Sequence, residues 1–318
     1  MKILITGAAG FIGSCSAVSL LEKGHTIYGI DSFDSYYSVK FKKKRIKKLK
    51  NYKNFYFKRI DLNKKKELEI FIKNKKINLV IHLAAQAGVR YSYENPAKYI
   101  DSNFFGFLNL VLVSKKNKIN KIIYASSSSV YGDSKILPVN EKSKLNKKNI
   151  YSVTKCLNEE TAKLYSNLYN INFVGLRFFT IFGEWGRPDM LIFKIFKSQI
   201  EKKVLKINNH GNHYRDFTYI DDVTKIINKL VYKKINGHEI FNLCSNNPIS
   251  ILDIIKNFKK KYNIKIKFAS LHKADVINTH GNNQKIRKFL KIKKLSNFYR
   301  SFYKTFEWYK KNKINKIS

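Results

Sequence analysis

Thr6-Gly7-Ala8-Ala9-Gly10-Phe11-Ile12-Gly13 is the stretch that decides the fold of this 318-residue chain. An apolar run at residues 2–5 precedes it and apolar residues at helical spacing follow it, which predicts a buried strand, a tight turn and a helix. Gly7 permits the turn, Gly10 lets the backbone approach a pyrophosphate, and Gly13 lets the helix pack closely on the strand. The free N–H groups of the helix N-terminus would hold the anion. A glycine-rich turn without a ligand has the same three glycines.

Asp31 follows the next predicted strand, residues 24–30, at about twenty residues from the glycines. An acid at this position of a nucleotide-binding fold accepts the adenosine ribose hydroxyls of NAD. The same carboxylate would repel a 2′-phosphate. We therefore predict an NAD site rather than an NADP site.

Strands and helices alternate through the first half of the chain. Strands are predicted at residues 55–60, 79–83, 121–125 and 173–178, and helices at residues 40–50, 68–75, 99–116 and 151–169. This alternation indicates right-handed βαβ units and a parallel sheet. The predicted fold class is α/β, with a doubly wound parallel (Rossmann) sheet over residues 1–178. A smaller C-terminal α/β lobe over residues 179–318 is expected to bind substrate, with 214–243 as a segment that can pack back on the first domain.

Two further strand ends carry candidate cofactor contacts. Leu83-Ala84-Ala85 is small enough to let a cofactor lie across the end of its strand. Asp61-Leu62 ends another strand, at a position suited to an adenine pocket. An exposed turn explains Asp61 equally well.

A run of four serines, residues 126–129, lies at the carboxyl end of the strand at 121–125. Doubly wound folds place their chemistry at this edge, although a serine-rich turn has the same composition. Tyr151 and Lys155 follow on a predicted helix at positions i and i+4, so that they share one face. A nearby cation favours the phenolate and lowers the pKa of a tyrosine from about 10. The pair therefore predicts a tyrosine that acts as a general base.

The formal net charge of +41 is unusually high. Only eight of the 63 basic residues are arginines, and the lysines are spread along the whole chain. A nucleic-acid-binding protein would more often concentrate its charge and use arginine. We therefore expect no nucleic-acid partner, and a field that attracts anionic small substrates.

Three widely spaced cysteines, Cys15, Cys156 and Cys244, fit no metal-binding pattern and are expected to be reduced thiols. The sequence has no run of eighteen apolar residues and no signal-peptide pattern. We therefore expect a cytoplasmic protein without a membrane partner or a bound metal.

These motifs together resemble the extended short-chain dehydrogenase/reductases, in particular the NAD-dependent sugar-nucleotide epimerase and dehydratase family. The resemblance covers nearly the whole chain. It implies that Ser127 is the catalytic hydroxyl that holds the sugar O4, that Tyr151 is the base, and that Lys155 binds the nicotinamide ribose. The cofactor contacts that it implies are Gly7, Gly10, Phe11, Ile12, Gly13, Asp31, Asp61, Leu62, Leu83, Ala84, Ala85, Asn103, Tyr151 and Lys155.

Ser128 and Ser129 distinguish branches of this family. Related dehydratases and uronate decarboxylases carry acidic residues after the catalytic hydroxyl, so their absence favours epimerisation at C4. Residues 84–92 and 176–190 are similar to UDP-glucuronate 4-epimerases. The resemblance thus implies reversible interconversion of UDP-glucuronate and UDP-galacturonate through a 4-keto sugar with tightly bound NAD, for surface polysaccharide supply. The alternative is a UDP-glucose or UDP-N-acetylglucosamine 4-epimerase.

The resemblance also implies a set of substrate contacts. Arg215 would reach the UDP pyrophosphate, and an ion pair with Asp216 or Asp221 is its alternative. Thr180 and Arg187, expected in a loop after the strand at 173–178, would hold the uronate carboxylate. Arg187 has the alternative of a salt bridge to Asp189 or Glu184. The whole set is Arg90, Ser127, Ser128, Thr180, Arg187, Arg215 and Asp275, the last of these within Lys273-Ala274-Asp275, where the family usually has Pro-Gly-Asp.

Relatives pair as homodimers through helices that correspond to residues 99–116 and 151–169. We therefore expect a homodimer, although core packing explains the apolar Phe104, Phe107, Leu157 and Leu164 equally well. A regulator that only senses the cofactor would be expected to have lost Tyr151 or Lys155. Both are present.

Overall fold

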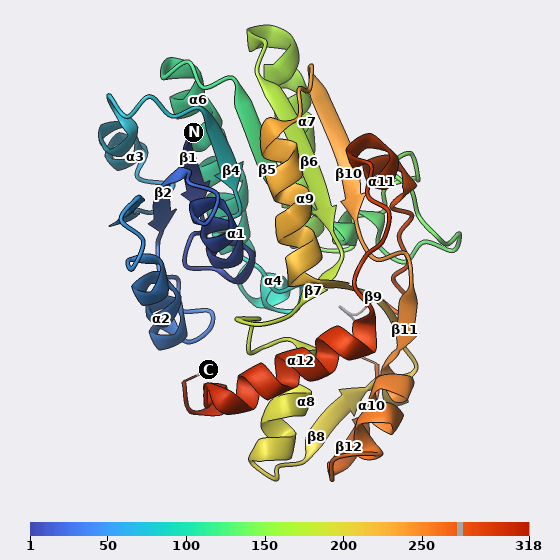
Figure 1. Cartoon of the computed structure of the whole chain (residues 1–318). Coiled ribbons are helices and arrows are strands. Elements are labelled where there is room, and N and C mark those ends of the chain that lie inside the picture. Colours follow the sequence, from blue (N-terminus) through green and yellow to red (C-terminus); the bar gives the residue numbers. More distant parts are fainter. Residues whose placement is uncertain (272–275, 318) are drawn as a thin grey trace.

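A seven-stranded parallel sheet lies at the centre of the computed structural model, which describes residues 1–271 and 276–317 (Figure 1). The strands of this sheet are β1 (Lys2–Thr6), β2 (Thr26–Asp31), β3 (Phe55–Arg59), β4 (Leu79–His82), β5 (Lys121–Ser127), β6 (Asn172–Phe178) and β10 (His238–Leu243). Their order, β10-β6-β5-β4-β1-β2-β3, runs outward in both directions from β1 and β4. The predicted doubly wound α/β sheet is confirmed.

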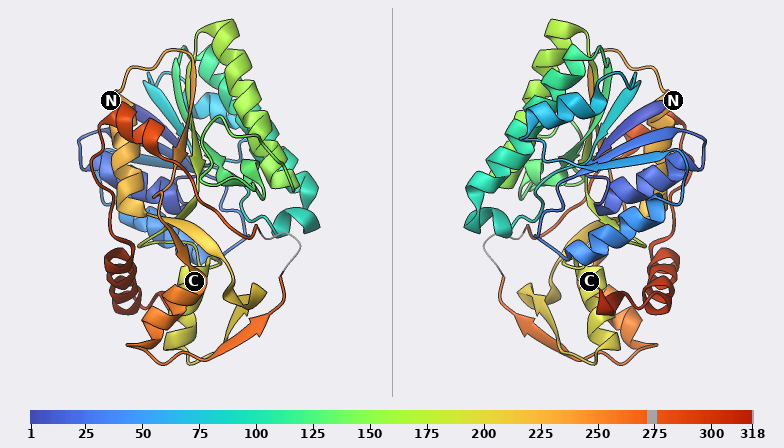
Figure 2. Two further views of the ribbon diagram at one scale, coloured as in Figure 1. Left: turned by 90° about the vertical axis from the view of Figure 1, so that its right-hand side faces the viewer. Right: turned by 90° about the vertical axis from the view of Figure 1, so that its left-hand side faces the viewer.

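Helices cover both faces of the sheet, because its strands alternate between two apolar cores. Ile3 and Ile5 face a core shared with α1 (Phe11–Leu21), α2 (Val39–Leu49) and α9 (Ile220–Tyr232). Leu4, between them, faces a second core with α3 (Lys65–Ile72), α6 (Gly106–Lys116) and α7 (Ile150–Tyr169). Figure 2 shows the two helical layers on opposite sides of the sheet.

The helix expected over residues 99–116 is present, but it starts earlier, at Pro96, and contains a π-helical segment. The structure has α4 (Tyr91–Glu94), α5 (Pro96–Tyr99), a π-helical segment (Ile100–Phe105) and then α6. A π-helical segment inserts extra backbone into a helix and is frequent at functional sites. Simple apolar spacing does not reveal it, because the residues on both sides keep helical periodicity.

The second half of the chain builds a smaller lobe below the sheet edge (Figure 1). Its strands are β7 (Thr180–Phe182), β9 (Tyr214–Tyr219) and β11 (Pro248–Ser250) in one sheet, and β8 (Leu205–Asn208) and β12 (Ile266–Ala269) in another. Its helices are α8 (Leu191–Ile200), α10 (Ile251–Lys259) and α12 (Phe298–Lys311). Buried Phe196, Phe258, Phe302 and Phe306 from these helices pack in tilted and edge-to-face pairs that form an aromatic core. Such ring pairs stabilise a core beyond the area that they bury.

The chain returns to the main sheet after β9. The helix α9 packs on α1, and β10 pairs in parallel with β6 at the sheet edge. The helix α11 (Gln284–Leu290) then packs on β10, with Phe289 against Phe241. Sequence positions far apart thereby share one sheet. No helix in the described parts of the chain is long and apolar enough to cross a membrane.

Candidate active site

A cleft of about 470 Å³ opens at the carboxyl ends of β1, β2, β4 and β5. Ligands of doubly wound folds bind at this edge, where the strand order reverses. The cleft is lined by fifteen of the residues predicted from the sequence: Gly7, Gly10, Phe11, Ile12, Gly13, Asp31, Asp61, Leu62, Leu83, Ala84, Ala85, Ser127, Tyr151, Lys155 and Arg187.

The glycine-rich turn has the backbone that its sequence predicts. Gly7 has a φ of +71°, and a Cβ there would lie 2.6 Å from the backbone nitrogen of Ala84. A Cβ on Gly13 would collide with the carbonyl oxygen of Gly7. The helix α1 starts at Phe11 with no side-chain cap from Gly10, so its first N–H groups are available to an anion. The turn therefore fits a dinucleotide pyrophosphate.

Asp31 is held at the tip of β2 by two backbone donors. Its Oδ2 accepts from the N–H of Ala9 at 3.0 Å, and its Oδ1 accepts from the N–H of Phe33 at 2.8 Å. Burial raises the pKa of Asp31, while these donors and the charge of Lys42 act in the opposite direction. A carboxylate fixed this way beside the phosphate turn fits the ribose diol of NAD.

The Asp31 geometry predicts cofactor choice. The 2′-phosphate of NADP would meet a fixed carboxylate, so NAD should activate the protein and NADP should not. Replacement of Asp31 by asparagine should weaken that preference, because the repulsion is lost while the size is kept. Cofactor titrations of both proteins check this, and equal activation of the unchanged protein by NADP would contradict the assignment.

Tyr151 and Lys155 project from α7 into the same cleft. The Nζ of Lys155 lies 5.9 Å from the centre of the Tyr151 ring and donates to the carbonyl of Ala125 at 2.9 Å. Burial lowers the pKa of Lys155 to about 8, and the charge of Glu159 opposes this. Lys155 is thus a buried cation near neutral pH.

The expected lowering of the tyrosine pKa is not what the structure shows. Burial raises the pKa of Tyr151, and the groups that act against this are a hydrogen bond with Ser127 and the charge of Arg187. The ammonium of Lys155 is directed at the Ala125 carbonyl, so its influence on the phenol is smaller than the i, i+4 spacing suggested. The protein alone therefore keeps Tyr151 protonated near neutral pH.

Ser127 has a defined hydrogen-bond direction. Its Oγ accepts from the N–H of Ser129 at 3.2 Å and from the hydroxyl of Ser129 at 2.9 Å. A hydroxyl carries one proton and two lone pairs, so Ser127 can still donate its proton into the cleft, where Tyr151 is its partner in the protein alone. The short 3₁₀ turn Ser128–Tyr131 places Ser129 for this role.

Asn103 supports the cleft from behind and does not line it. Its buried amide accepts from the N–H of Gln86 at 2.7 Å and donates to the carbonyl of Gln86 at 3.1 Å and to Oγ1 of Thr154 at 3.2 Å. Asn103 thus ties the loop after β4 to α7. The π-helical segment carries it to this position.

Several predicted substrate contacts lie outside the cleft lining. Arg90, Ser128 and Thr180 are not among the lining residues. Thr180 belongs to the strand β7 and not to a loop as expected. Asp275 lies outside the described residues.

Arg215 is turned toward the segment that precedes α11. Its guanidinium donates to the carbonyls of Tyr214 at 3.0 Å, of Ile277 at 2.6 Å and of Val276 at 2.5 Å. Asp216, one of its alternative partners, accepts instead from Ser245. Arg215 does not line the cleft in this structure.

Arg187 lines the cleft but is also engaged in an ion pair. It forms a two-pronged contact with Asp189, in which Nε and Oδ1 are 3.0 Å apart, and Tyr36 donates its hydroxyl to Oδ2 of Asp189 at 3.2 Å. Burial alone would raise the pKa of Asp189, but the charge of Arg187 holds it below its ordinary value. The alternative salt bridge to Asp189 is therefore present.

Sequence reasoning missed other lining residues. Tyr36, Lys42, Gln86 and Lys98 line the cleft, and Lys98 forms a salt bridge of 2.6 Å with Asp34. Lys42 donates to the carbonyl of Asp34 at 2.6 Å. The one available signal was the position of residues 33–37 directly after Asp31, since a loop that follows the ribose acid must border the same cleft.

Comparisons with known proteins agree with this site. Residues 3–244 match the NAD dependent epimerase/dehydratase family. Protein CapI of Staphylococcus aureus is 37% identical over 97% of this chain and 98% of its own length. UDP-glucuronate 4-epimerase of Thermodesulfobacterium geofontis is 38% identical, with 97% and 96% covered.

A solved structure gives the same result. UDP-glucuronic acid 4-epimerase of Bacillus cereus, in complex with UDP-glucuronic acid and NAD, is 31% identical and superposes with a TM-score of 0.92. The match covers 98% of this chain and all of that one. The predicted resemblance to UDP-glucuronate 4-epimerases and the predicted cofactor, NAD, are confirmed. The chain belongs to the NAD dependent epimerase/dehydratase family.

Proposed function

We propose that this protein interconverts UDP-glucuronate and UDP-galacturonate by inverting C4, with NAD retained. The observation that carries the proposal is the convergence of Ser127, Tyr151, Lys155 and Arg187 in one cleft beside the Asp31 site. Its similarity to named UDP-glucuronate 4-epimerases supports the choice of sugar.

The residues have distinct parts in the proposed reaction. Bound NAD would supply the hydride acceptor and donor for C4 and a positively charged ring in the cleft. Tyr151 takes the O4 proton, which requires that its pKa falls from the raised value of the protein alone. Ser127 donates its remaining proton toward O4 and thereby fixes that oxygen. Lys155 would hold the nicotinamide ribose.

The carboxylate needs its own partner. The 4-keto sugar is a β-keto acid that is prone to lose its carboxylate, so the protein must hold that group fixed. A buried carboxylate without a partner is costly. Arg187 offers a guanidinium fork at the cleft wall, and the sugar carboxylate would share it with Asp189 or replace Asp189 there.

Replacement of Arg187 by alanine tests this choice of sugar. Turnover of UDP-glucuronate should fall at least tenfold, because a charge-assisted hydrogen bond contributes about 1.5–3 kcal/mol. Any slow reaction with UDP-glucose should be spared, since a neutral C6 needs no cation. The exposed Arg300 on α12 provides the matched control, and Arg300→Ala should change neither rate.

The Arg187–Asp189 ion pair also gives a physical basis to the alternative function, epimerisation of a neutral UDP-sugar. If Arg187 stays paired with Asp189, the cleft presents no free charge at C6 and suits UDP-glucose or UDP-N-acetylglucosamine. An Arg187→Ala variant that loses both sugars equally would favour this alternative. Steady-state rates for each sugar distinguish the two.

We further propose that the two parts of the chain bind different ligands and that the protein acts in the cytoplasm. Residues 1–178 would bind NAD and residues 179–318 the UDP-sugar, with 214–243 partly returned to the first domain. The setting is the cytoplasm, where the three cysteines, all within the described residues, would remain free thiols. The product would supply surface polysaccharide synthesis.

A homodimer is the proposed assembly. Phe105, Leu164 and Leu168 are 48%, 54% and 59% exposed on the α6–α7 side, whereas Phe107 is fully buried and belongs to the core. Exposed apolar groups on adjacent helices suit a two-fold interface. Light scattering at micromolar concentration should give twice the chain mass of 37.3 kDa, and Leu164→Lys should shift it toward the monomer. A monomeric mass for the unchanged protein would contradict the dimer.

A further inference from the structure

Glu159 shares a buried face of α7 with two residues of the site. It lies one helical turn after Lys155 and two turns after Tyr151, at a spacing that places side chains on the same face. Lys155 and Glu159 are 1% and 4% exposed. Glu159 does not line the cleft, so any effect on the reaction must pass through its neighbours.

The carboxylate of Glu159 receives three hydrogen bonds from the main sheet. Ser126 donates its hydroxyl to Oε1 at 2.5 Å, and Arg177 donates Nε to Oε1 at 2.9 Å and Nη2 to Oε2 at 2.7 Å. Ser126 lines the cleft and directly precedes Ser127 at the end of β5. Glu159 thus fastens this strand end to α7.

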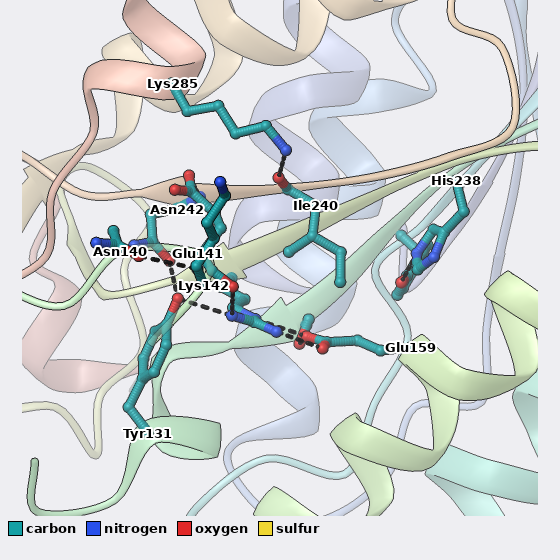
Figure 3. A network of polar contacts seen from close by, with 12 residues as sticks. Tyr131, Asn140, Glu141, Lys142, Glu159, His238, Ile240, Asn242 and Lys285 are labelled. Atoms are coloured by element: carbon teal, nitrogen blue, oxygen red, sulfur yellow. Dashed lines mark hydrogen bonds and ion pairs between the residues drawn. The ribbon is translucent and has the colours of Figure 1, made fainter. Parts of the chain in front are cut away.

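Arg177 extends these contacts into a network (Figure 3). Its Nη1 donates to the hydroxyl of Tyr131 at 2.8 Å and to the carbonyl of Glu141 at 3.2 Å. Tyr131 donates in turn to Oδ1 of Asn242 on β10 at 2.7 Å. Figure 3 shows Tyr131, Glu141 and Asn242 gathered on one side and Glu159 on the other. Through Arg177 and Tyr131, the network connects Glu159 to Asn242 on β10.

We propose that Glu159 is a positioning residue of the reaction, which fixes the Ser126–Ser127 strand end and supplies the buried negative charge that keeps the Lys155 ammonium beside Tyr151. The inference rests on the proposed function, because it requires Ser127 and Lys155 to act in the cleft. A buried ion pair is weak evidence of a stabilising role. The role of Glu159 therefore follows from the groups that it holds in place, and not from the stability that its ion pair with Arg177 provides.

The groups around this cluster keep one charge state near neutral pH. Burial lowers the pKa of His82 on β4 to about 3 and that of His238 on β10 to about 4, so both rings stay neutral. Burial raises the pKa of Tyr124 on β5 well above its ordinary value, and that of Cys156 on α7 to about 11. Arg177 on β6 stays charged.

Lys155 is thus the member of the cluster that titrates near neutral pH. Burial lowers its pKa to about 8, and the negative charge of Glu159 is what opposes this. Without that charge, Lys155 should lose its proton at a lower pH. Deprotonated Lys155 cannot provide a cation beside Tyr151, so the alkaline limb of the kcat profile should report the change.

The Glu159→Gln variant keeps the shape and removes the charge. We expect the alkaline limb of kcat to move by about one pH unit to lower pH, with about tenfold lower kcat on the limb. Glu160→Gln is the matched control, since Glu160 is the next residue on α7, is exposed and should leave the limb in place. Ser126→Ala removes the strand contact alone and should lower kcat without moving the limb.

A double variant provides the test if the Glu159→Gln variant does not fold. Glu159→Gln leaves Arg177 as an unpaired buried charge, so Glu159→Gln with Arg177→Met removes both charges together. The limb should stay shifted in this double variant, and NAD binding followed by fluorescence should weaken at a lower pH than in the unchanged protein. An unmoved limb and an unmoved binding profile in the folded double variant would overturn the inference. An unchanged protein inactive on UDP-sugars would instead overturn the proposed function, and the NAD titration would still test Glu159.

Discussion

Replacement of Tyr151 by phenylalanine is expected to lower kcat by about 10²–10⁴-fold, the effect typical of a lost acid–base group. This corresponds to about 2.7–5.5 kcal/mol of transition-state stabilisation. The loss should fall on kcat and leave UDP-sugar binding nearly intact, because the ring and its contact with Tyr99 remain. Steady-state kinetics and calorimetric titration with UDP-glucuronate measure the two quantities separately.

Tyr169 at the end of the same helix gives a control of equal chemistry. It is 42% exposed, and Tyr169→Phe should keep full turnover. Near-normal turnover in the Tyr151→Phe variant would show that another group takes the O4 proton. The raised pKa of Tyr151 makes this a demanding test, because the phenol must be activated in the assembled site.

Replacement of Lys155 by methionine is expected to reduce both turnover and affinity for NAD. Methionine fills a similar buried volume, so the change removes the ammonium and its bond to Ala125 without opening a large cavity. The rate should fall by about 10²-fold or more, as for other groups that act in proton transfer. Fluorescence titration with NAD measures the affinity, and Lys163→Met, exposed on the same helix, is the control.

The pH profile of the unchanged protein gives the same residue a second test. The folded pKa of Lys155 is about 8, below its ordinary value of about 10.4, so the ammonium is present below pH 8 and lost above it. We therefore expect kcat to fall as pH rises through about 8. The Lys155→Met variant should lack that limb, and retention of the limb would assign it to another group.

Local spacing explains why much of the site could be predicted from the sequence. The turn from Gly7 to Gly13, the acid at Asp31 and the Tyr151–Lys155 pair each depend on residues close together in the chain. Their positions follow from backbone sterics and helix geometry. The fold class followed for the same reason, because each strand and helix carries its own apolar period.

Contacts between distant segments could not be predicted in this way. Glu159 and Arg177 each look like ordinary helix or strand polar residues, and only the packing of α7 on β6 shows that they form a buried pair. Arg215 was expected in the cleft, but its direction depends on carbonyls about sixty residues later. Asn103 depends on the π-helical segment, which apolar periodicity does not reveal.

The effect of burial on a pKa could not be predicted from the sequence either. The i, i+4 spacing of Tyr151 and Lys155 predicted a lowered tyrosine pKa, yet burial dominates and raises it. Desolvation depends on every element that covers a group, so the sequence distance between two residues cannot supply it.

The most direct test of the central claim is turnover of purified protein with NAD on UDP-glucuronate, UDP-glucose and UDP-N-acetylglucosamine, with products identified by NMR. We expect UDP-glucuronate to be converted to UDP-galacturonate, and the other two sugars to react at least tenfold more slowly. Preference for UDP-glucose or UDP-N-acetylglucosamine would contradict the uronate assignment, and formation of a decarboxylated pentose would contradict the proposed fixation of the carboxylate.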